Sequence, residues 1–239
     1  FTVNPMGARL LKQWLQHPLL DVDEIDIRLD IVTDFYSDIR FCEDIIDKLK
    51  SVFDMERLLS RIVTGRTNAR DLLNLKQSLD IISPVKTLLR ESGFENLILR
   101  FENLDPINGL TETLGNALVE NPPLTIQEGG IIKKGYSKEL DELREISEKG
   151  KDWLIQYQNE ERKRTGISTL KVNYNKVFGY YIEVTNVHKD KVPETYIRKQ
   201  TLVNAERYIT PELKEWEDKI LHAEEKMNDL EYRLFQELR

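Results

Sequence analysis

The most constraining feature of the sequence is a change of apolar period between residues 137 and 234. Two stretches repeat apolar residues at steps of three and four, and the segment between them alternates every two residues. Steps of three and four place apolar side chains on one helix face and, sustained over several turns, are typical of a coiled-coil seam. Alternation is typical of β-strands. The pattern therefore predicts a helix going out, a small sheet, and a helix coming back.

The two helices have recognisable ends. Ser137 can cap the outgoing helix, which we expect to end after the charged run EERKR and before Gly166. The returning helix begins at Thr210-Pro211, where Thr caps and Pro occupies the first turn. At about 1.5 Å per helical residue, such an arm is about 40 Å long. The expected seam positions are Leu140, Leu143, Ile146, Trp153, Leu154 and Tyr157 in the first helix, and Leu213, Trp216, Ile220, Ala223, Met227, Leu230 and Leu234 in the second.

The segment TLKVNYNKVFGYYIEVT between the helices has strand character. Apolar residues alternate at Leu170, Val172 and Tyr174, and β-branched and aromatic residues follow from Tyr181. Asn175 and Gly179 supply turn or bulge chemistry. We therefore expect a β-rich tip on an antiparallel helical arm.

The first 120 residues are expected to form a helical scaffold. A helix precedes Pro18, and Asp21 with Glu24 predicts the capped start of the next. Asn68 is a second candidate cap, for a helix that stops at Ser83-Pro84. Residues 120–136, with two prolines and three glycines, predict a connection with a short hairpin across Gly129-Gly130. The apolar stripe expected after Asp21 is Val22, Ile25, Leu29, Val32 and Tyr36, and further stripes run through residues 39–53, 55–62 and 72–82.

Composition excludes several classes of protein. The chain has 239 residues, 40% of them hydrophobic, which is enough for a buried core. No run reaches the roughly 18 to 20 apolar residues of a membrane span, and the N-terminus lacks signal-peptide features. A single Cys42 forms no internal disulfide, and three scattered histidines offer no zinc spacing. We also expect this chain to be a piece of a longer polypeptide, because it begins at Phe1 and stops at Arg239 inside a helical, charged pattern.

Positive charge is concentrated in one window. The net charge of the chain is −7, but residues 162–207 hold ten Lys and Arg against four Asp and Glu. This window therefore carries +6, at the expected β tip, and the remainder carries −13. Such asymmetry is typical of a local anion-binding face on an acidic scaffold.

Candidate contacts in the window divide by chemistry. Lysines and arginines can neutralise phosphates, and Asn, Thr and Tyr side chains can donate hydrogen bonds to phosphate oxygens. Structural alternatives remain open for several of them: Asn173 and Asn175 as turn formers, Tyr180 and Tyr181 as core, and Arg207 as the partner of a neighbouring acid. The basic candidates are Lys171, Lys176, Lys189, Lys191, Arg198 and Lys199, and the polar ones are Asn173, Asn175, Tyr180, Thr201 and Asn204.

Catalytic motifs are absent from the sequence. The stretch nearest to a phosphate-binding P-loop, residues 130–137, has Tyr136 where the lysine must be. No G-x-S-x-G motif occurs, and no nucleophile stands beside a base. We therefore expect no catalytic residues, no metal site and no nucleotide hydrolysis in this chain.

Longer stretches of sequence resemble one family. GISTLKVNYNKVFGYYIEVTN, followed by YIRKQTLVNAERYITPELKEWEDKI, resembles the clamp region of the bacterial DNA mismatch repair family MutS. PMGARLLKQWLQHPLLDVDEIDIRLDIV is similar to the start of that family's core, or lever, domain, and EGGIIKKGYSKELDELR to the helix leading into the clamp. The resemblance covers essentially the whole chain.

The resemblance implies a mainly α fold, a helical lever bundle with a long antiparallel arm carrying a small β-rich clamp at its tip. It divides the chain into 1–136 (lever), 137–165 (outgoing helix), 166–209 (clamp) and 210–239 (returning helix and lever continuation). It also implies double-stranded DNA, the rest of the MutS chain and a second MutS subunit as partners, in the cytoplasm and without a membrane. ATP and Mg²⁺ would be cofactors of the longer protein and not of this segment. A coiled-coil adaptor without a DNA role is the alternative.

By resemblance the contacts to the DNA backbone fall on Asn173 to Lys176 and on Lys199 to Arg207, with Asn204 foremost. Val203 stands where some relatives have lysine, and Asn173 where many have glycine. Phe94-Glu95 and Phe101-Glu102 are not interpreted as the family's mismatch-reading Phe-x-Glu. The complete set of expected backbone-binding residues is Lys171, Asn173, Asn175, Lys176, Lys189, Arg198, Lys199, Asn204 and Arg207.

Overall fold

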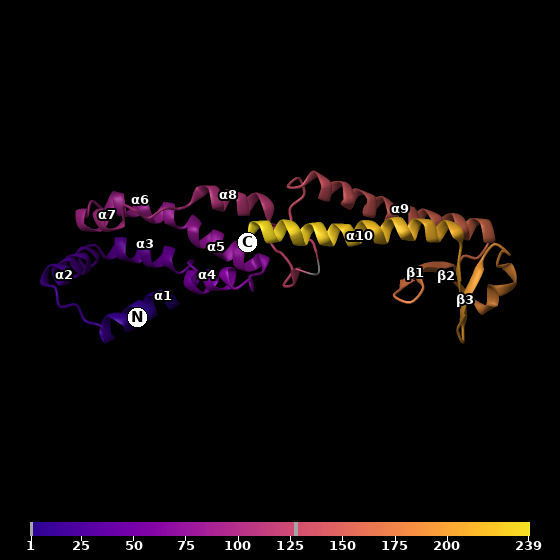
Figure 1. Cartoon of the computed structure of the whole chain (residues 1–239), viewed down its shortest axis with the longest axis horizontal. Helices are drawn as coiled ribbons and strands as arrows, with labels where there is room; N and C mark the ends of the chain where they lie inside the picture. Colours follow the sequence, from indigo (N-terminus) through magenta and orange to yellow (C-terminus); the bar gives the residue numbers. More distant parts are fainter. Residues whose placement is uncertain (1, 127–128) are drawn as a thin grey trace. The chain divides into compact units, whose positions relative to one another are not determined.

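The computed structural model of the chain describes residues 2–126 and 129–239. They form two compact units, one running to Tyr136 and including Leu234–Arg239, the other comprising Ser137–Arg233. We call them unit 1 and unit 2 (Figure 1). The described residues are mostly helical and contain a single four-stranded sheet, which confirms the expected mainly α class.

Unit 1 is a set of short helices whose starts are set by polar caps. The side chains of Asn4, Asp21, Asp38 and Asp54 each accept a hydrogen bond from a backbone N–H of the helix that follows. Asn68 forms a reciprocal capping box with Asp71. These helices are α1 (Pro5–Gln16), α2 (Val22–Ser37), α3 (Ile39–Leu49), α4 (Met55–Val63), α5 (Ala69–Asp80), α6 (Ile82–Ser92), α7 (Glu95–Phe101) and α8 (Asn108–Ala117).

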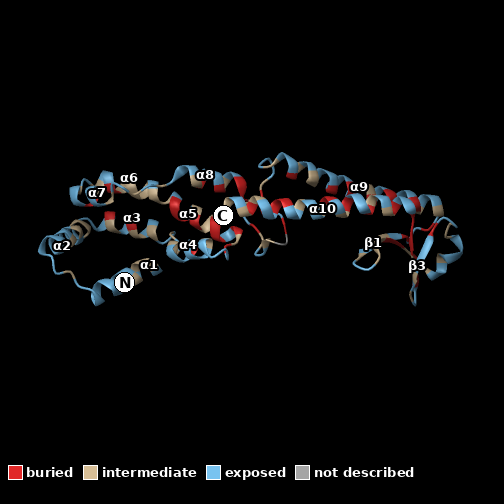
Figure 2. Ribbon diagram, viewed as in Figure 1, coloured by how far each residue is buried: buried red, intermediate tan, exposed pale blue. Residues whose placement is uncertain are grey.

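Two apolar clusters form part of the core of unit 1. One joins α3, α6 and α7 through Phe41, Ile45, Leu89 and Leu97. The other joins α4 and α5 through Leu58, Leu75 and Leu79. Figure 2 shows buried residues concentrated along α5, whereas α1 and α2 are largely exposed.

The expected apolar face of α2 is wrong. Leu29 and Val32 are exposed, and Ile31 and Phe35 pack against the α3–α6–α7 cluster instead. Phe35 stacks on Phe41 with ring centroids 5.3 Å apart. Both sets of residues repeat at helical steps, so periodicity predicted a helix correctly but did not identify which face meets the core.

Two further expectations change in detail. The helix that begins after Asn68 ends at Asp80, and Pro84 lies in the first turn of α6, where a missing N–H costs little. In the following connection, Leu118 pairs with Ile132 in an antiparallel bridge, and the loop between them contains Gly129 and Gly130. That loop includes residues 127–128, which lie outside the described part of the chain.

Unit 2 is built on two long antiparallel helices, α9 (Lys138–Thr165) and α10 (Pro211–Leu238), of which α10 continues past Arg233. The Ser137 and Thr210 caps are confirmed, since Leu140 N–H and Leu213 N–H donate to their hydroxyl groups. Gly166 ends α9 in the left-handed conformation. Figure 1 shows the helices side by side, with the strands at one end of the pair.

Contacts between α9 and α10 define their antiparallel pairing. Near the sheet, Trp153 stacks on Trp216 with ring centroids 4.8 Å apart. Arg144 donates to Glu231 at 2.5 Å towards the other end. The predicted seam is largely confirmed, because Leu140, Leu154, Tyr157, Leu213, Ile220, Ala223 and Leu230 are buried. The other seam residues are partly buried, except Ile146, which lies half exposed.

The sheet has the strand order β1-β2-β4-β3, with every neighbouring pair antiparallel. Its strands are β1 (Lys171–Asn175), β2 (Gly179–Thr185), β3 (Ile197–Thr201) and β4 (Ala205–Ile209), with a 3₁₀ helix, η2 (Asn186–Lys191), after β2. One sheet face packs on the ends of α9 and α10. The resulting core contains Leu154, Tyr157, Ile167, Leu170, Ile182, Val184, Tyr196, Tyr208, Leu213 and Ile220.

Candidate nucleic-acid interface

The face of the sheet that points away from the core gathers part of the predicted set. Lys171, Asn173 and Asn175 alternate along β1 and therefore share one face. Lys171 is opposite Glu183 in β2, and Glu183 is opposite Arg207 in β4, so Arg207 shares that face too. Strand pairing thus brings together four predicted residues from two parts of the sequence.

Arg207 on this face is already partnered. Its guanidinium donates to Glu183 at 3.2 Å and to Gln200 at 2.8 Å, and it lies 4.4 Å from the ring centroid of Tyr181. These contacts confirm the alternative that Arg207 pairs with a neighbouring acid. Its charge is consequently partly neutralised within the sheet.

Asn175 shapes the β1–β2 turn. Its side-chain oxygen accepts hydrogen bonds from the backbone N–H groups of Val177 at 3.0 Å and Phe178 at 2.7 Å. This confirms Asn175 as a turn former, whereas Asn173 lies within β1 and forms no turn. The turn displays Lys176, whose side chain is exposed.

The β3–β4 turn carries Asn204. Asn186 holds this turn from η2, since its backbone N–H donates to the Asn204 carbonyl at 3.1 Å and its side chain to the Val203 carbonyl at 2.9 Å. Asn204 is exposed beside Val203, which has 91% of its surface accessible. Asn186 was not among the predicted residues, although asparagine after a strand is a common turn signal.

Lys199 and Arg198 differ although they are adjacent in β3. The pairing of β3 with β4 shifts register between Arg198 and Gln200, so Lys199 is an extra, bulged residue with an exposed side chain. Arg198 lies on the core side of the sheet, opposite Tyr208, and forms an ion pair of 3.4 Å with Glu206.

Two acids of this region, Glu206 and Glu161, are engaged by neighbours. A hydrogen bond from Tyr208, together with the nearby Arg198 charge, lowers the pKa of Glu206. Burial and the same hydrogen bond raise the pKa of Tyr208 to about 12. The buried Glu161 of α9 accepts from Tyr196 and pairs with Arg164 at 2.6 Å. These carboxylates are therefore occupied within unit 2.

Five lysines in the same region are exposed, and within the described part of the chain none has a carboxylate within 4 Å. Lys171 lies on β1, Lys176 in the first turn, and Lys199 on the bulge, with the other two on η2. We call this set the free lysines: Lys171, Lys176, Lys189, Lys191 and Lys199. The sheet and its loops therefore carry five lysines that form no ion pair with a described carboxylate.

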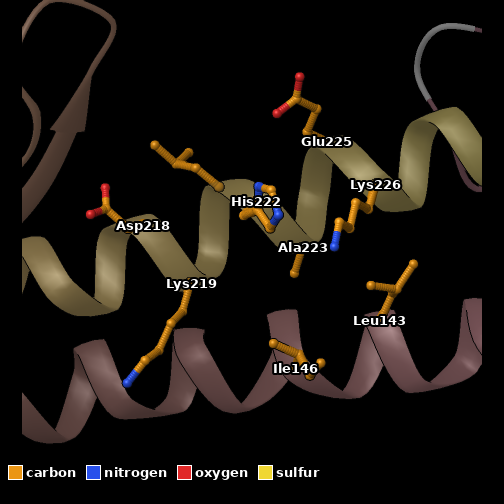
Figure 3. Close-up of a pocket in the computed structure, with 9 residues that line it drawn as sticks. Leu143, Ile146, Asp218, Lys219, His222, Ala223, Glu225 and Lys226 are labelled. Atoms are coloured by element: carbon orange, nitrogen blue, oxygen red, sulfur yellow. The ribbon is translucent and has the colours of Figure 1, made fainter.

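A pocket of about 690 Å³ lies elsewhere in unit 2, along α9 and α10. Figure 3 shows Leu143 and Ile146 of α9 below Ala223 and Lys226 of α10, with His222 above. Its charged lining mixes the acids Asp218 and Glu225 with the lysines Lys219 and Lys226. Among the described residues no three His, Cys, Asp or Glu side chains are grouped to hold a metal ion. None of the described helices is long and apolar enough to cross a membrane.

The stretch from Gly130 to Ser137 has the glycine spacing of a P-loop but not its lysine. Tyr136 occupies the position that needs lysine, and the stretch from Gly130 leads through Ile131 and Ile132, both buried, and through a turn into α9. The fold and the surface together define a helical protein whose paired helices present a basic sheet.

Comparison with known proteins identifies the family. The model of MutS family domain IV matches residues 135–226. The chain is 51% identical to the DNA mismatch repair protein MutS of Methanosarcina mazei, 48% to that of Halothermothrix orenii and 49% to that of Lactobacillus acidophilus. Each match covers 100% of this chain and 27% to 28% of the relative. The chain belongs to the MutS family, and it spans about 27% of the length of these relatives.

Proposed function

We propose that unit 2 is a clamp that binds the backbone of double-stranded DNA without reading its sequence. The observation that carries this proposal is the set of free lysines on the sheet and its loops. Lysine ammonium groups bind phosphate as point charges and release counterions from DNA. Backbone contacts of this kind position a protein on the duplex and carry no sequence information.

The polar predicted residues would supplement the lysines. Asn173 and Asn204 can donate hydrogen bonds to phosphate oxygens, whereas the turn role of Asn175 engages its oxygen and leaves its amide N–H groups as donors. Arg198 and Arg207 would contribute less than the lysines, because each already pairs with a glutamate. We therefore rank the free lysines and Asn204 above the two arginines.

The wider role we propose is in DNA mismatch repair. Relatives named DNA mismatch repair protein MutS match the chain over its whole length. Unit 1 with the α9–α10 pair would act as the lever that transmits conformational change between DNA and the rest of the family protein, including a second subunit. ATP and Mg²⁺ would be bound by other parts of that protein, and the whole would act on DNA in the cytoplasm.

The direct test is a titration of the chain against one matched and one mismatched fluorescent duplex at two salt concentrations. We expect equal binding of the two duplexes, with a dissociation constant on the order of 10⁻⁴ to 10⁻⁶ M, weakened by salt. The logarithm of the binding constant should fall by about 0.9 per phosphate contact for each unit of log salt.

A triple variant, Lys171→Ala, Lys176→Ala and Lys199→Ala, tests the assigned surface. Its salt slope should shrink by up to about 2.7, since three contacts are removed. The matched control removes three exposed lysines that pair with acids on the arm, Lys138, Lys149 and Lys151, and changes net charge equally. Equal loss in both variants, or none in the first, would overturn the clamp and favour a coiled-coil adaptor, which family membership does not favour.

A further inference from the structure

The β1–β2 turn is held by two side chains of α10. Glu217 accepts a hydrogen bond from the backbone N–H of Tyr180, at the start of β2. Lys214 donates to the backbone carbonyl of Phe178 at 2.6 Å and to Glu217 at 2.7 Å. Glu217 is buried, with only 7% of its surface accessible. The two residues thus clasp both sides of Gly179, and we call this arrangement the turn latch.

The turn latch requires glycine at position 179. Its φ of +72° lies in the left-handed region, which glycine adopts without steric cost. A Cβ at this position would lie 2.3 Å from either carboxylate oxygen of Glu217. The absence of a side chain therefore lets the carboxylate approach the backbone and reach the Tyr180 N–H.

The other end of the hairpin is held by α9. Gln158 accepts a hydrogen bond from the Val172 N–H at 2.8 Å, and Arg162 donates to the Leu170 carbonyl at 2.7 Å. Thus α9 positions the start of β1, whereas α10 positions the turn. The hairpin that carries Lys171, Asn173 and Lys176 is consequently tied to both helices of the arm.

We propose that Glu217 is a positioning residue for DNA binding, acting through the turn latch to hold the β1–β2 turn and its Lys176 in the binding orientation. The proposal rests on the proposed clamp function. A turn that is ordered before binding loses less conformational freedom on contact with the backbone. A buried carboxylate with a charged partner and a backbone donor costs much to disrupt and so keeps the turn in one place.

The negative charge of Glu217 distinguishes the positioning role from a simple electrostatic effect on DNA binding. Removing an acid from a DNA-binding surface ordinarily strengthens binding, because it removes repulsion from phosphate. The turn latch predicts the opposite for Glu217→Ala. Glu217→Gln removes the same charge but keeps an oxygen that can accept from Tyr180, and Asp218→Ala removes the same charge from an exposed neighbour.

The first readout is amide hydrogen exchange in the 239-residue chain. We expect the Tyr180 amide to exchange about tenfold faster in Glu217→Ala, because its hydrogen bond is lost. Glu217→Gln and Asp218→Ala should leave that rate within about threefold of the unaltered chain. If Glu217→Ala fails to fold, the comparison of Glu217→Gln with Asp218→Ala still tests the hydrogen bond, since an unprotected Tyr180 in the former alone would overturn it.

The second readout is affinity for a matched duplex at low salt. We expect Glu217→Ala to bind about three- to tenfold more weakly, and the other two variants to bind as tightly as the unaltered chain or more tightly. Binding by Glu217→Ala as tight as by Asp218→Ala would overturn the positioning role. If the unaltered chain binds no DNA, the clamp function and this use of Glu217 both fail, and the exchange rates then assign the turn latch to structure alone.

Discussion

Gly150 determines how closely the two helices of unit 2 approach each other. It is buried in the middle of α9, opposite Ile220 of α10. A Cβ at this position would lie 2.3 Å from the Ile220 Cγ1. Glycine in a helix interior ordinarily costs about 0.5 to 1 kcal/mol relative to alanine, so helix packing compensates for its presence here.

We therefore expect Gly150→Ala to destabilise unit 2 by about 1 to 3 kcal/mol, because the added methyl forces the helices apart. The measurement is urea unfolding followed by tryptophan fluorescence, to which the stacked Trp153 and Trp216 contribute. Gly109→Ala is the matched control, because nothing lies within 4 Å of a Cβ there. This control should leave the free energy of unfolding unchanged or raise it by up to about 1 kcal/mol. A neutral Gly150→Ala would contradict the close approach.

At the scale of elements, α2 shows that periodicity predicts a helix, whereas packing against neighbouring helices determines which face of it is buried. Its sequence carries apolar residues on more than one face, and the stripe through Leu29 is exposed. The face that packs carries Ile31 and Phe35. Helix formation depends on local spacing and on the Asp21 cap, whereas the buried face depends on where α3, α6 and α7 lie.

The two faces of α2 should respond differently to truncation. We expect Phe35→Ala to cost about 1.5 to 3 kcal/mol, since it removes the stacking on Phe41 and leaves a cavity. Leu29→Ala, on the exposed stripe, should change stability by less than about 0.5 kcal/mol. Chemical denaturation monitored by circular dichroism compares them. A larger loss of stability in Leu29→Ala than in Phe35→Ala would contradict this packing and support the buried face that the sequence predicted.

At the scale of the whole chain, unit 2 has a buried core of its own. That core joins the ends of α9 and α10 to the sheet, and all its members lie between Leu154 and Ile220. A unit with its own core and its own hydrogen-bonded sheet is expected to fold independently. The basic residues of the proposed clamp lie in the same unit.

We therefore expect residues 137–233, produced alone, to unfold cooperatively and to bind DNA with the same salt slope as the 239-residue chain. The measurements are a thermal melt followed by circular dichroism and the duplex titration at two salt concentrations. The unit without its free lysines is the control for binding. A smaller slope for the isolated unit would place phosphate contacts in unit 1.

The sequence by itself determined the order of helix, sheet and helix in unit 2 and the first five helices of unit 1, but not α6, α7, α8, η2 or the strands β3 and β4 one by one. Local sequence signals predict where helices begin and end. These signals are the caps at Ser137, Asn68 and Thr210, the helix end at Gly166, and the change from helical to alternating period. The concentration of lysines between residues 162 and 207 was equally visible, because charge can be counted without a fold.

Only the tertiary structure decided which of those charges are free. Arg207 is paired because the register of β2 with β4 places it opposite Glu183, and Lys199 is exposed because β3 bulges there. Glu217 accepts a hydrogen bond from Tyr180 at the β1–β2 turn, although the two residues are 37 positions apart in the sequence. Such partners depend on strand register and helix packing, which bring distant residues together and which no local pattern encodes.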